Sequence, residues 1–300
     1  MNRPRIVVLG AVAVDVKAKS FGALVRTSDV PGRVLVKIGG VARNVAKDLA
    51  RLGAEVTIVS AVGDDEFGRM IRADLSRAGV NLDHLIVSRN YPTAAWVGIL
   101  DERGDLAIGI FGGEVLDAIT SQFVGERAAA IATADLIAVD ATLPRVAMDA
   151  IVALAKANHL PLYLNPASAA RAQTVADIVG HYTIVSANAL EAQRLTGESV
   201  GSIDDAKRAV QTLVARGVRR ALVTLGADGM VYADAQETRY APAQPTRVVD
   251  TTGAGDALAA MFLLCHLSGR SLDETLARAL HAAALTVACD ESVSEEIGQA

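Results

Sequence analysis

Cysteines, aromatic residues and long apolar runs are scarce in this chain of 300 residues. Its two cysteines, Cys265 and Cys289, stand in apolar surroundings and are predicted to be buried free thiols. A disulfide framework or a zinc site needs more cysteines, or histidines at ligand spacing. No apolar run is long enough to cross a bilayer, and Ile6–Leu9 begins without the longer apolar region of a signal peptide. We therefore expect a soluble, cytoplasmic protein.

Excess positive charge and two common nucleotide-binding motifs are also missing. The formal net charge is −5, so neither nucleic acid nor an anionic membrane surface is an expected partner. The pattern G-x-x-x-x-G-K-[ST] of a P-loop does not occur. The turn from Gly10 to Asp15 has one glycine where a dinucleotide fold has G-x-G-x-x-G. A nicotinamide or flavin enzyme is therefore disfavoured.

Strand-like and helix-like segments alternate through most of the chain, of which 51% is hydrophobic. The strand-like segments are mostly continuous apolar runs, which is typical of strands buried on both faces. Such alternation predicts a doubly wound, mostly parallel sheet with helices on both faces. The predicted strands include Ile6–Leu9, Val56–Ser60, Leu136–Val139, Pro161–Asn165, Thr183–Val185 and Ala221–Thr224, and the predicted helices include Val41–Leu52, Phe67–Ala78, Arg145–Ala157 and Ile203–Arg216.

Three short strands lie outside this alternation. Arg33–Ile38 follows a turn, and Ala94–Leu100 and Leu106–Phe111 flank a five-residue polar loop, as in a β-hairpin. They predict a small separate sheet with strands drawn from about 12–38 and 92–113, within a single domain spanning 1–300.

The segment Asp250-Thr251-Thr252-Gly253-Ala254-Gly255-Asp256 is the strongest candidate for chemistry. It follows the strand-like run 246–249 and precedes the helical run 257–264. A glycine-rich turn at a helix start exposes N–H groups to an anion, so Gly253, Ala254 and Gly255 could form an anion hole. Asp256 is then a candidate general base, with a low pKa expected at a helix start. The segment alone fits an ordinary helix start equally well.

Together with Gly39-Gly40-x-x-x-Asn44, about 210 residues upstream, this segment resembles the two hallmarks of the ribokinase-like (PfkB) family of sugar and nucleoside kinases. The resemblance covers essentially the whole chain. It implies transfer of phosphate from ATP, with Mg²⁺, to a hydroxyl of a small molecule. It also implies that the small sheet is a lid over the substrate and the surface of a homodimer.

The resemblance places the sugar against Asp15, Gly39, Gly40 and Asn44, with Thr93 as a weaker candidate. Asp15 follows the first strand, at the edge where open α/β sheets bind ligands. Without the resemblance, Asp15 is equally a turn residue, Asn44 a solvated helix residue and Thr93 a residue that suits a sheet.

Three further segments resemble the nucleotide and cation sites of the family. Asn188 and Glu191 match a motif that organises Mg²⁺ through water, although they also fit a capping box. Thr224, Gly226 and Gly229 match a nucleotide loop, or form an ordinary hairpin turn. Asp250 and Thr252, with the backbone after Ala288, match a K⁺ site. Two weaker signals are 165–167, which resembles a segment near the γ-phosphate, and His281, more typical of packing or surface.

Within the family, 29–33, 39–46 and the acidic end after Cys289 resemble pseudouridine kinases. Val30 and 111–114 depart from that pattern, and the second of these lies in the predicted lid. We therefore expect a kinase acting on the 5′-hydroxyl of a ribosyl compound, with pseudouridine as the first choice. Ribose, another furanose and an ordinary nucleoside stay open, as does a non-catalytic sugar or nucleoside sensor on the same fold.

Overall fold

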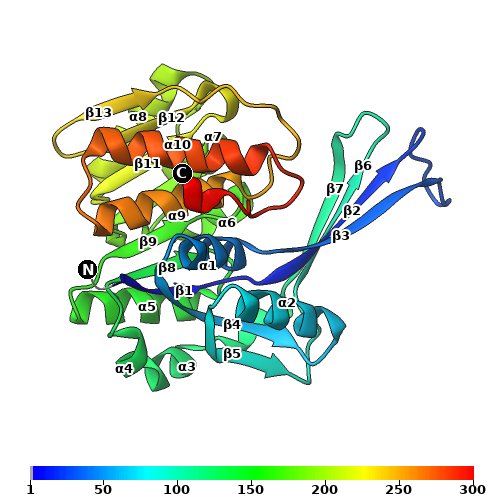
Figure 1. Cartoon of the computed structure of the whole chain (residues 1–300), viewed down its shortest axis with the longest axis horizontal. Helices are drawn as coiled ribbons and strands as arrows, with labels where there is room; N and C mark the ends of the chain where they lie inside the picture. Colours follow the sequence, from blue (N-terminus) through cyan, green and yellow to red (C-terminus); the bar gives the residue numbers. More distant parts are fainter. Residues whose placement is uncertain (1–2) are drawn as a thin grey trace.

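The computed structural model describes residues 3–300 and contains two sheets of unequal size (Figure 1). The large sheet has nine strands in the order β13-β12-β11-β10-β9-β8-β1-β4-β5. The seven strands from β11 to β5 in this order run parallel, and β12 and β13 continue the sheet antiparallel. The strands are β1 Arg5–Leu9, β4 Glu55–Gly63, β5 Asn81–Ser88, β8 Leu136–Asp140, β9 Leu162–Asn165, β10 Ile184–Asn188, β11 Arg220–Thr224, β12 Met230–Asp234 and β13 Thr238–Ala241.

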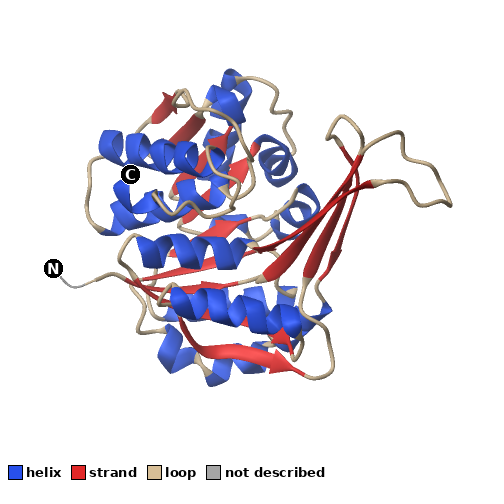
Figure 2. Ribbon diagram, turned by 45° about the vertical axis from the view of Figure 1, so that its right-hand side comes forward, coloured by secondary structure: helices blue, strands red, loops and turns tan. Residues whose placement is uncertain are grey.

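Helices cover both faces of the large sheet (Figure 2). Four of them share one apolar core: α1 Val41–Arg51, α2 Glu66–Arg77, α9 Ala254–Leu267 and α10 Leu272–Val287. The second core is covered by α3 Ser121–Glu126, α4 Ala128–Ile131, α5 Arg145–Ala157, α6 Ala169–Val175, α7 Ala189–Thr196 and α8 Ile203–Ala215. Four short 3₁₀ turns, Glu114–Ala118, Val179–His181, Gly226–Asp228 and Ile297–Gln299, complete the described elements.

Alternate residues of each strand enter the two cores. In β1, Ile6 and Val8 belong to the core under α1 and α9, whereas Val7 and Leu9 belong to the core under α3 to α8. This is the two-residue period of a strand buried on both faces, and it explains why the sequence shows continuous apolar runs. The predicted fold class, a mostly parallel sheet with helices on both faces and a smaller separate sheet, is confirmed.

The small sheet has the order β3-β2-β6-β7 and extends away from the large sheet, at the right of Figure 1. Its strands are β2 Ala13–Ser20, β3 Gly32–Gly39, β6 Ala95–Leu100 and β7 Leu106–Gly112. β2 pairs antiparallel with β3 and parallel with β6, and β6 pairs antiparallel with β7. β2 begins four residues after β1 ends, so the first strand of the large sheet leads directly into the small one.

The outward face of the small sheet is apolar and exposed. Residues opposite one another in register share a face, and Val16 and Ala18 lie opposite apolar residues of β3 and β6. The exposed members at the two edge strands are Val34, Val36, Ile108 and Ile110.

Two predictions about elements were wrong. The run Thr246–Val249 is not a strand but irregular, and Val248 is 66% exposed. Its backbone hydrogen bond is the one from Val249 N to the carbonyl oxygen of Val287 in α10. β-Branched residues there lack a neighbouring strand to pair with. Cys265 is buried, as predicted, but Cys289 follows α10 and is partly exposed.

None of the helices described in residues 3–300 is long and apolar enough to span a membrane.

Candidate active site

Asp256 lies in the first turn of α9 and is 8% exposed. Its Oδ2 accepts a hydrogen bond from Asn44 Nδ2 at 2.9 Å, and its Oδ1 accepts one from Asn165 Nδ2 at 3.2 Å. Asn44 belongs to α1, and Asn165 ends β9. Three segments far apart in the sequence therefore hold one carboxylate. Asn44 is itself buried, so its interpretation as a solvated helix residue was wrong.

The pKa of Asp256 is raised to about 7, not lowered as the sequence predicted. Burial is the largest cause, and the charges of Asp140 and Glu191 add to it, whereas the bonds from Asn44 and Asn165 act against it. The helix dipole is the effect that the sequence argument used, but removal from water outweighs it here. A carboxylate with a pKa near neutrality is suited to accept a proton at neutral pH.

Asp140, at the carboxyl end of β8, was missed by the sequence analysis. Its Oδ2 accepts hydrogen bonds from the N–H groups of Ala11 and Ala42, at 2.9 and 3.1 Å. It fixes the turn after β1 to the start of α1, and a Cβ on Gly10 would lie 2.1 Å from its Oδ2. The signal was available, because an Asp directly after a buried strand marks the ligand-binding edge of an open α/β sheet.

The glycine-rich turn before α9 is tightly packed on one side and open on the other. Gly253 is the N-cap of α9 with φ +84°, and a Cβ there would lie 1.9 Å from the carbonyl oxygen of Ser292. Only glycine fits that position without a backbone shift. A Cβ on Gly255, in contrast, would meet no atom within 4 Å.

A cavity of about 210 Å³ lies in front of this turn. It gathers six residues that the sequence analysis selected, together with Asn165, Ala167 and three others. The six are Asn188, Glu191, Thr224, Gly253, Gly255 and Asp256. Ala254, Gly226 and Gly229 are not among its lining residues; Gly226 and Gly229 lie at the 3₁₀ turn after β11, with φ of +60° and +93°.

Asn188 and Glu191 form the capping box that was the alternative interpretation of their motif. Asn188 Oδ1 accepts from Glu191 N, and Glu191 Oε2 accepts from Asn188 N, both at 2.9 Å. Glu191 is buried, and burial raises its pKa. The cap holds a carboxyl group at the wall of the cavity that also contains Asp256.

Asp15, Gly39 and Gly40 lie where the small sheet joins α1. A Cβ on Gly39 would be 2.2 Å from Asp15 Oδ2, so the glycine makes room for that carboxylate. Gly40 has φ +93°, and a Cβ there would lie 2.5 Å from the carbonyl oxygen of Ala11. Burial raises the pKa of Asp15, partly offset by Lys17 and Arg43.

Thr93 is separated in its contacts from the other sugar candidates. Its Oγ1 donates to Asp65 Oδ1 at 2.6 Å and accepts from Gly63 N at 2.9 Å. Asp65 is also the N-cap of α2. The buried Thr93 hydroxyl therefore ties the start of β6 to α2.

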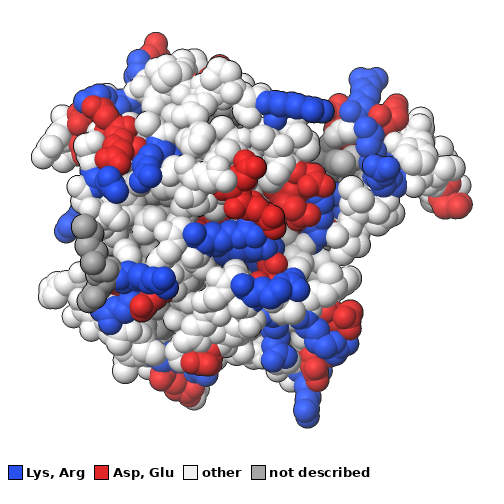
Figure 3. Space-filling view, viewed as in Figure 1, with Lys and Arg blue, Asp and Glu red and all other residues white. Residues whose placement is uncertain are grey.

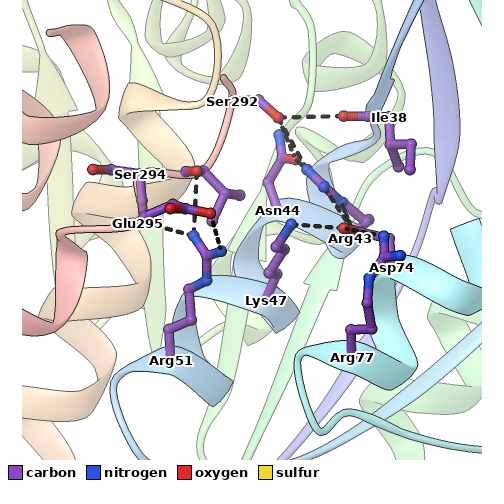
Figure 4. A network of polar contacts seen from close by, with 11 residues as sticks. Ile38, Arg43, Asn44, Lys47, Arg51, Asp74, Arg77, Ser292, Ser294 and Glu295 are labelled. Carbon is purple, nitrogen blue, oxygen red and sulfur yellow. Dashed lines mark hydrogen bonds and ion pairs between the residues drawn. The ribbon is translucent and has the colours of Figure 1, made fainter. Parts of the chain in front are cut away.

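Arg43 links Asn44 to two residues that the sequence analysis missed, Asp74 and Ser292 (Figure 4). Its Nε and Nη2 donate to Asp74 Oδ2 at 2.9 and 2.6 Å, and its Nη1 donates to Asn44 Oδ1 and Ser292 Oγ at 2.9 and 3.0 Å. Lys47 donates to the other oxygen of Asp74. This buried network holds the amide group whose Nδ2 contacts Asp256.

The C-terminal segment lies across the basic side of α1. Arg51 donates to the carbonyl oxygen of Ser294 at 2.8 Å and pairs with Glu295, and Lys37 pairs with Asp290. Figure 3 shows acidic and basic side chains together in the middle of the face of the molecule that is seen in Figure 1. The segment that packs against Gly253 is thereby fixed to the helix that carries Asn44.

Lys17, on β2, reaches the turn before α9. Its Nζ donates to Asp250 Oδ2 at 2.9 Å and to Thr252 Oγ1 at 2.7 Å. The sequence analysis did not select Lys17, because a lysine on a strand has no motif of its own. His281 lies apart from the site, with Nδ1 2.8 Å from Gln244 Oε1.

Comparisons with known proteins identify the family of this chain. The model of the pfkB family carbohydrate kinases matches residues 3–296. Pseudouridine kinase of Escherichia coli (strain K12) is 27% identical over 286 residues, covering 95% of this chain and 91% of that protein. Guanosine-inosine kinase of Exiguobacterium acetylicum is 27% identical over 303 residues, covering 96% of each chain.

Among solved structures, the ribokinase of Arabidopsis thaliana complexed with ribose and ATP superposes with a TM-score of 0.86 at 24% identity, covering 99% of this chain and 97% of that one. It supports the fold. The family match extends over nearly the whole chain. The chain therefore belongs to the pfkB family of carbohydrate kinases, enzymes that phosphorylate hydroxyl groups.

Proposed function

We propose that this protein transfers the γ-phosphate of ATP to the 5′-hydroxyl of a ribosyl compound, with pseudouridine as the first choice. The observation that carries the proposal is the placement of Asp256. A carboxylate with a pKa near 7 lies beside a glycine-rich helix start, in a cavity lined by residues from the ends of three strands, β9, β10 and β11. A hydroxyl acceptor beside the carboxylate gives it a proton to accept. The phosphate that is transferred gives the helix start an anion to stabilise.

The transfer step needs no covalent enzyme intermediate. The 5′-oxygen forms a bond to the γ-phosphorus, the bond from that phosphorus to the β–γ bridging oxygen breaks, and ADP leaves with the electron pair. Asp256 accepts the hydroxyl proton. The N–H groups of Gly253, Ala254 and Gly255 stabilise the charge on the transferred phosphoryl group, and positioning contributes most because the transition state is loose.

Asp15, Gly39, Gly40 and Asn44 are proposed to hold the sugar. The Asp15 carboxylate makes no hydrogen bond within the described residues 3–300, so both oxygens are available to sugar hydroxyls. Asn44 accepts at Oδ1 from Arg43 and Ser292 and donates one N–H to Asp256, which leaves the second N–H of its amide for the substrate. Thr93 stays a weaker candidate, because its hydroxyl is already bonded to Asp65, the N-cap of α2, and to Gly63, the last residue of β4.

Asn188, Thr224, Gly226 and Gly229 are proposed to bind the nucleotide, with Glu191 directed at its Mg²⁺ through water. Within residues 3–300, no group of three or more His, Cys, Asp or Glu residues is arranged to hold a metal ion. That fits Mg²⁺, which binds few protein carboxylates and keeps waters and substrate phosphates as ligands. When bound, the ion neutralises phosphate charge; Glu191 contributes a carboxyl group at the cavity wall.

The inner face of the small sheet favours a nucleoside over a plain sugar. Trp96 lies opposite Asp15 in register, and Phe111 lies opposite Trp96, so all three share one face. The Trp96 ring lies over Gly98 and Gly109. A Cβ atom added to these glycines would be 2.2 and 3.2 Å from the ring, so the absence of side chains makes room for it. An aromatic surface beside the proposed sugar position gives a nucleobase a stacking partner.

A homodimer through the small sheet is proposed from its exposed apolar face. Val34, Val36, Ile108 and Ile110 are between 46% and 63% exposed and lie on one face of the four-stranded sheet. A second copy presents the same apolar residues, so an isologous contact covers both faces at once. The cytoplasmic location expected from the sequence stays a prediction.

The proposal is tested by an ADP-release screen over pseudouridine, uridine, adenosine, inosine, ribose and fructose, each with MgATP. The expected result is ADP production that depends on a ribosyl acceptor and is fastest with pseudouridine. Phosphate should appear on the 5′-oxygen of the product by ³¹P–¹H NMR. Ligand binding without ADP production across the panel would instead support a non-catalytic sensor.

A further inference from the structure

The turn before the anion hole is closed by three side chains. Lys17 Nζ donates to Asp250 Oδ2 and Thr252 Oγ1, and Thr252 Oγ1 donates to Asp250 Oδ1 at 2.7 Å. The N–H of Thr252 also donates to Asp250 Oδ1, at 2.9 Å. The side chains of Lys17 and Asp250 are each about a quarter exposed, at 23% and 25%. Every acceptor of this small ring thus has a donor from within the chain.

The ring sets the backbone that leads into the proposed anion hole. Thr252 is directly followed by Gly253, which has a left-handed backbone and packs against Ser292. Partial burial would raise the pKa of Asp250, but the bonds from Lys17 and Thr252 keep it below its usual value. Asp250 is therefore ionised, and its charge needs a compensating cation close by.

Asp250 and Thr252 are the residues at which the family resemblance predicts K⁺. The structure gives their outward-facing oxygens to an ammonium group that carries the same charge. A second monovalent cation at the same oxygens would have to displace that ammonium or lie against it, and either costs Coulomb energy at contact distance. The donor set around Asp250 does not fit an additional K⁺.

We propose that Lys17 is a positioning residue for phosphoryl transfer, and that its ammonium group, in place of a bound monovalent cation, orders the turn 250–253. The proposal rests on the kinase function above. Lys17 is two residues from Asp15 on the same face of β2. The strand that contacts the sugar therefore also supplies the charge that holds the anion hole, so placement of the small sheet and assembly of the phosphate site are linked.

Kinetics in two salts test this. Wild type, Lys17→Met and Lys17→Arg are compared in KCl and in tetramethylammonium chloride at equal ionic strength. Wild-type kcat should agree in the two salts within about twofold, whereas kcat of Lys17→Met should fall at least about tenfold without K⁺ and recover with it. KM for the ribosyl substrate should change less than kcat, and Lys17→Arg should keep most of the turnover in both salts.

Lys19→Met is the matched control. Lys19 lies on the same strand and face, two residues further on, and makes no ion pair among the described residues. Its replacement should leave kcat unchanged in both salts. Activation of the wild type by K⁺, or an unchanged kcat of Lys17→Met in tetramethylammonium, would overturn the proposal.

A second measurement separates this proposal from the kinase assignment. Thermal unfolding in the same two salts needs no turnover. The wild type should melt at the same temperature in both salts. Lys17→Met should melt at a higher temperature in KCl, because K⁺ then binds the turn 250–253 in the folded protein and not in the unfolded chain. A K⁺-specific shift in the wild type, or none in Lys17→Met, contradicts the role of Lys17 even if the substrate panel gives no ADP.

Discussion

The two sheets of this protein differ in what surrounds them. The large sheet is buried on both faces, and its carboxyl edge holds Asp140, Asn165 and Glu191 around Asp256 through bonds from several elements. The small sheet has one face toward the site and one apolar face toward solvent. Its strands carry Asp15, and Lys17 ties it to Asp250 in the turn before α9.

The difference separates chemistry from recognition. Groups that must hold a reacting atom within a fraction of an ångström lie on elements fixed by two cores. In the proposed function, Asp15 and Gly39 contact the acceptor from the small sheet, whose outward face lies outside both cores. The relatives fit this division, since proteins with about the same identity to this chain are named for different substrates.

The largest expected effect comes from the tightly packed glycine of the large-sheet site. Gly253→Ala forces a Cβ to within 1.9 Å of the Ser292 carbonyl at a left-handed φ. The turn must shift, and the proposed anion hole with it, so kcat should fall by about a hundredfold or more. Gly255→Ala is the control for stability, because its Cβ meets nothing within 4 Å. Equal melting temperatures for the two variants would show that the packing at Gly253 is not restrictive.

The buried network behind Asn44 is expected to matter for stability. Asp74→Ala leaves the guanidinium of Arg43, whose side chain is 4% exposed, without its carboxylate. The free energy of unfolding should fall by about 3 kcal/mol, since breaking a buried ion pair leaves an uncompensated charge. Urea unfolding measures it. Glu66→Ala, on the same helix but with an exposed partner, should leave the free energy nearly unchanged; a similar loss in both would contradict the network's importance.

Asp256 should cost stability at the pH where it is needed. Its native pKa of about 7 exceeds the ordinary 3.8, so the stability from this group is complete below pH 3.8 and lost as the pH rises through 7. Asp256→Asn does not titrate, so it should be more stable than wild type above pH 7, by at most about 4 kcal/mol at roughly 1.4 kcal/mol per pKa unit. The gain in the free energy of unfolding is reduced, because the NH2 group of the new Asn faces the N–H donor of either Asn44 or Asn165 and cannot accept its hydrogen bond.

Unfolding at pH 5, 6 and 8 tests the sign of this effect. The difference between Asp256→Asn and wild type should grow from pH 5 to pH 8. A difference that is constant over this range would show that Asp256 is ionised throughout in the folded protein.

The smallest effect on turnover should come from the outward face of the small sheet. Ile108→Lys places a charge within the proposed dimer contact and should convert a dimer to a monomer in sedimentation velocity. Because the inner face is untouched, kcat should stay within about threefold. Val146→Lys, at an exposed site on α5, should not change the oligomeric state. A wild type that is monomeric at all concentrations would remove the proposed dimer.

Much of the large sheet could be predicted from the sequence, because strands buried on both faces and helices with capping residues leave strong local patterns. Helix Ile203–Ala215 with its Ser202 cap and helix Ala189–Thr196 with its Asn188 cap are examples. The prediction of a strand over 246–249 was wrong, because β-branched residues indicate a tendency to form a strand but not whether a neighbouring strand is available to pair with it.

The site was predicted unevenly for a physical reason. Asp256 and Gly253 lie in one continuous motif, so the sequence could find them. The pKa of Asp256 depends on burial and on two carboxyl groups from distant elements, Asp140 of β8 and Glu191 of α7, which no local pattern contains. Asp74, Ser292 and Lys17 act through contacts across as many as 249 positions of the chain, and each looks like an ordinary polar residue in sequence.

The central claim is that Asp256 accepts the proton of the acceptor hydroxyl, and the turnover of Asp256→Asn tests it most directly. With the best acceptor from the panel, kcat should fall by about a hundredfold to ten-thousandfold, while calorimetry shows the acceptor and ATP still binding. A kcat within tenfold of wild type, with binding intact, would contradict the assignment of Asp256 as the base.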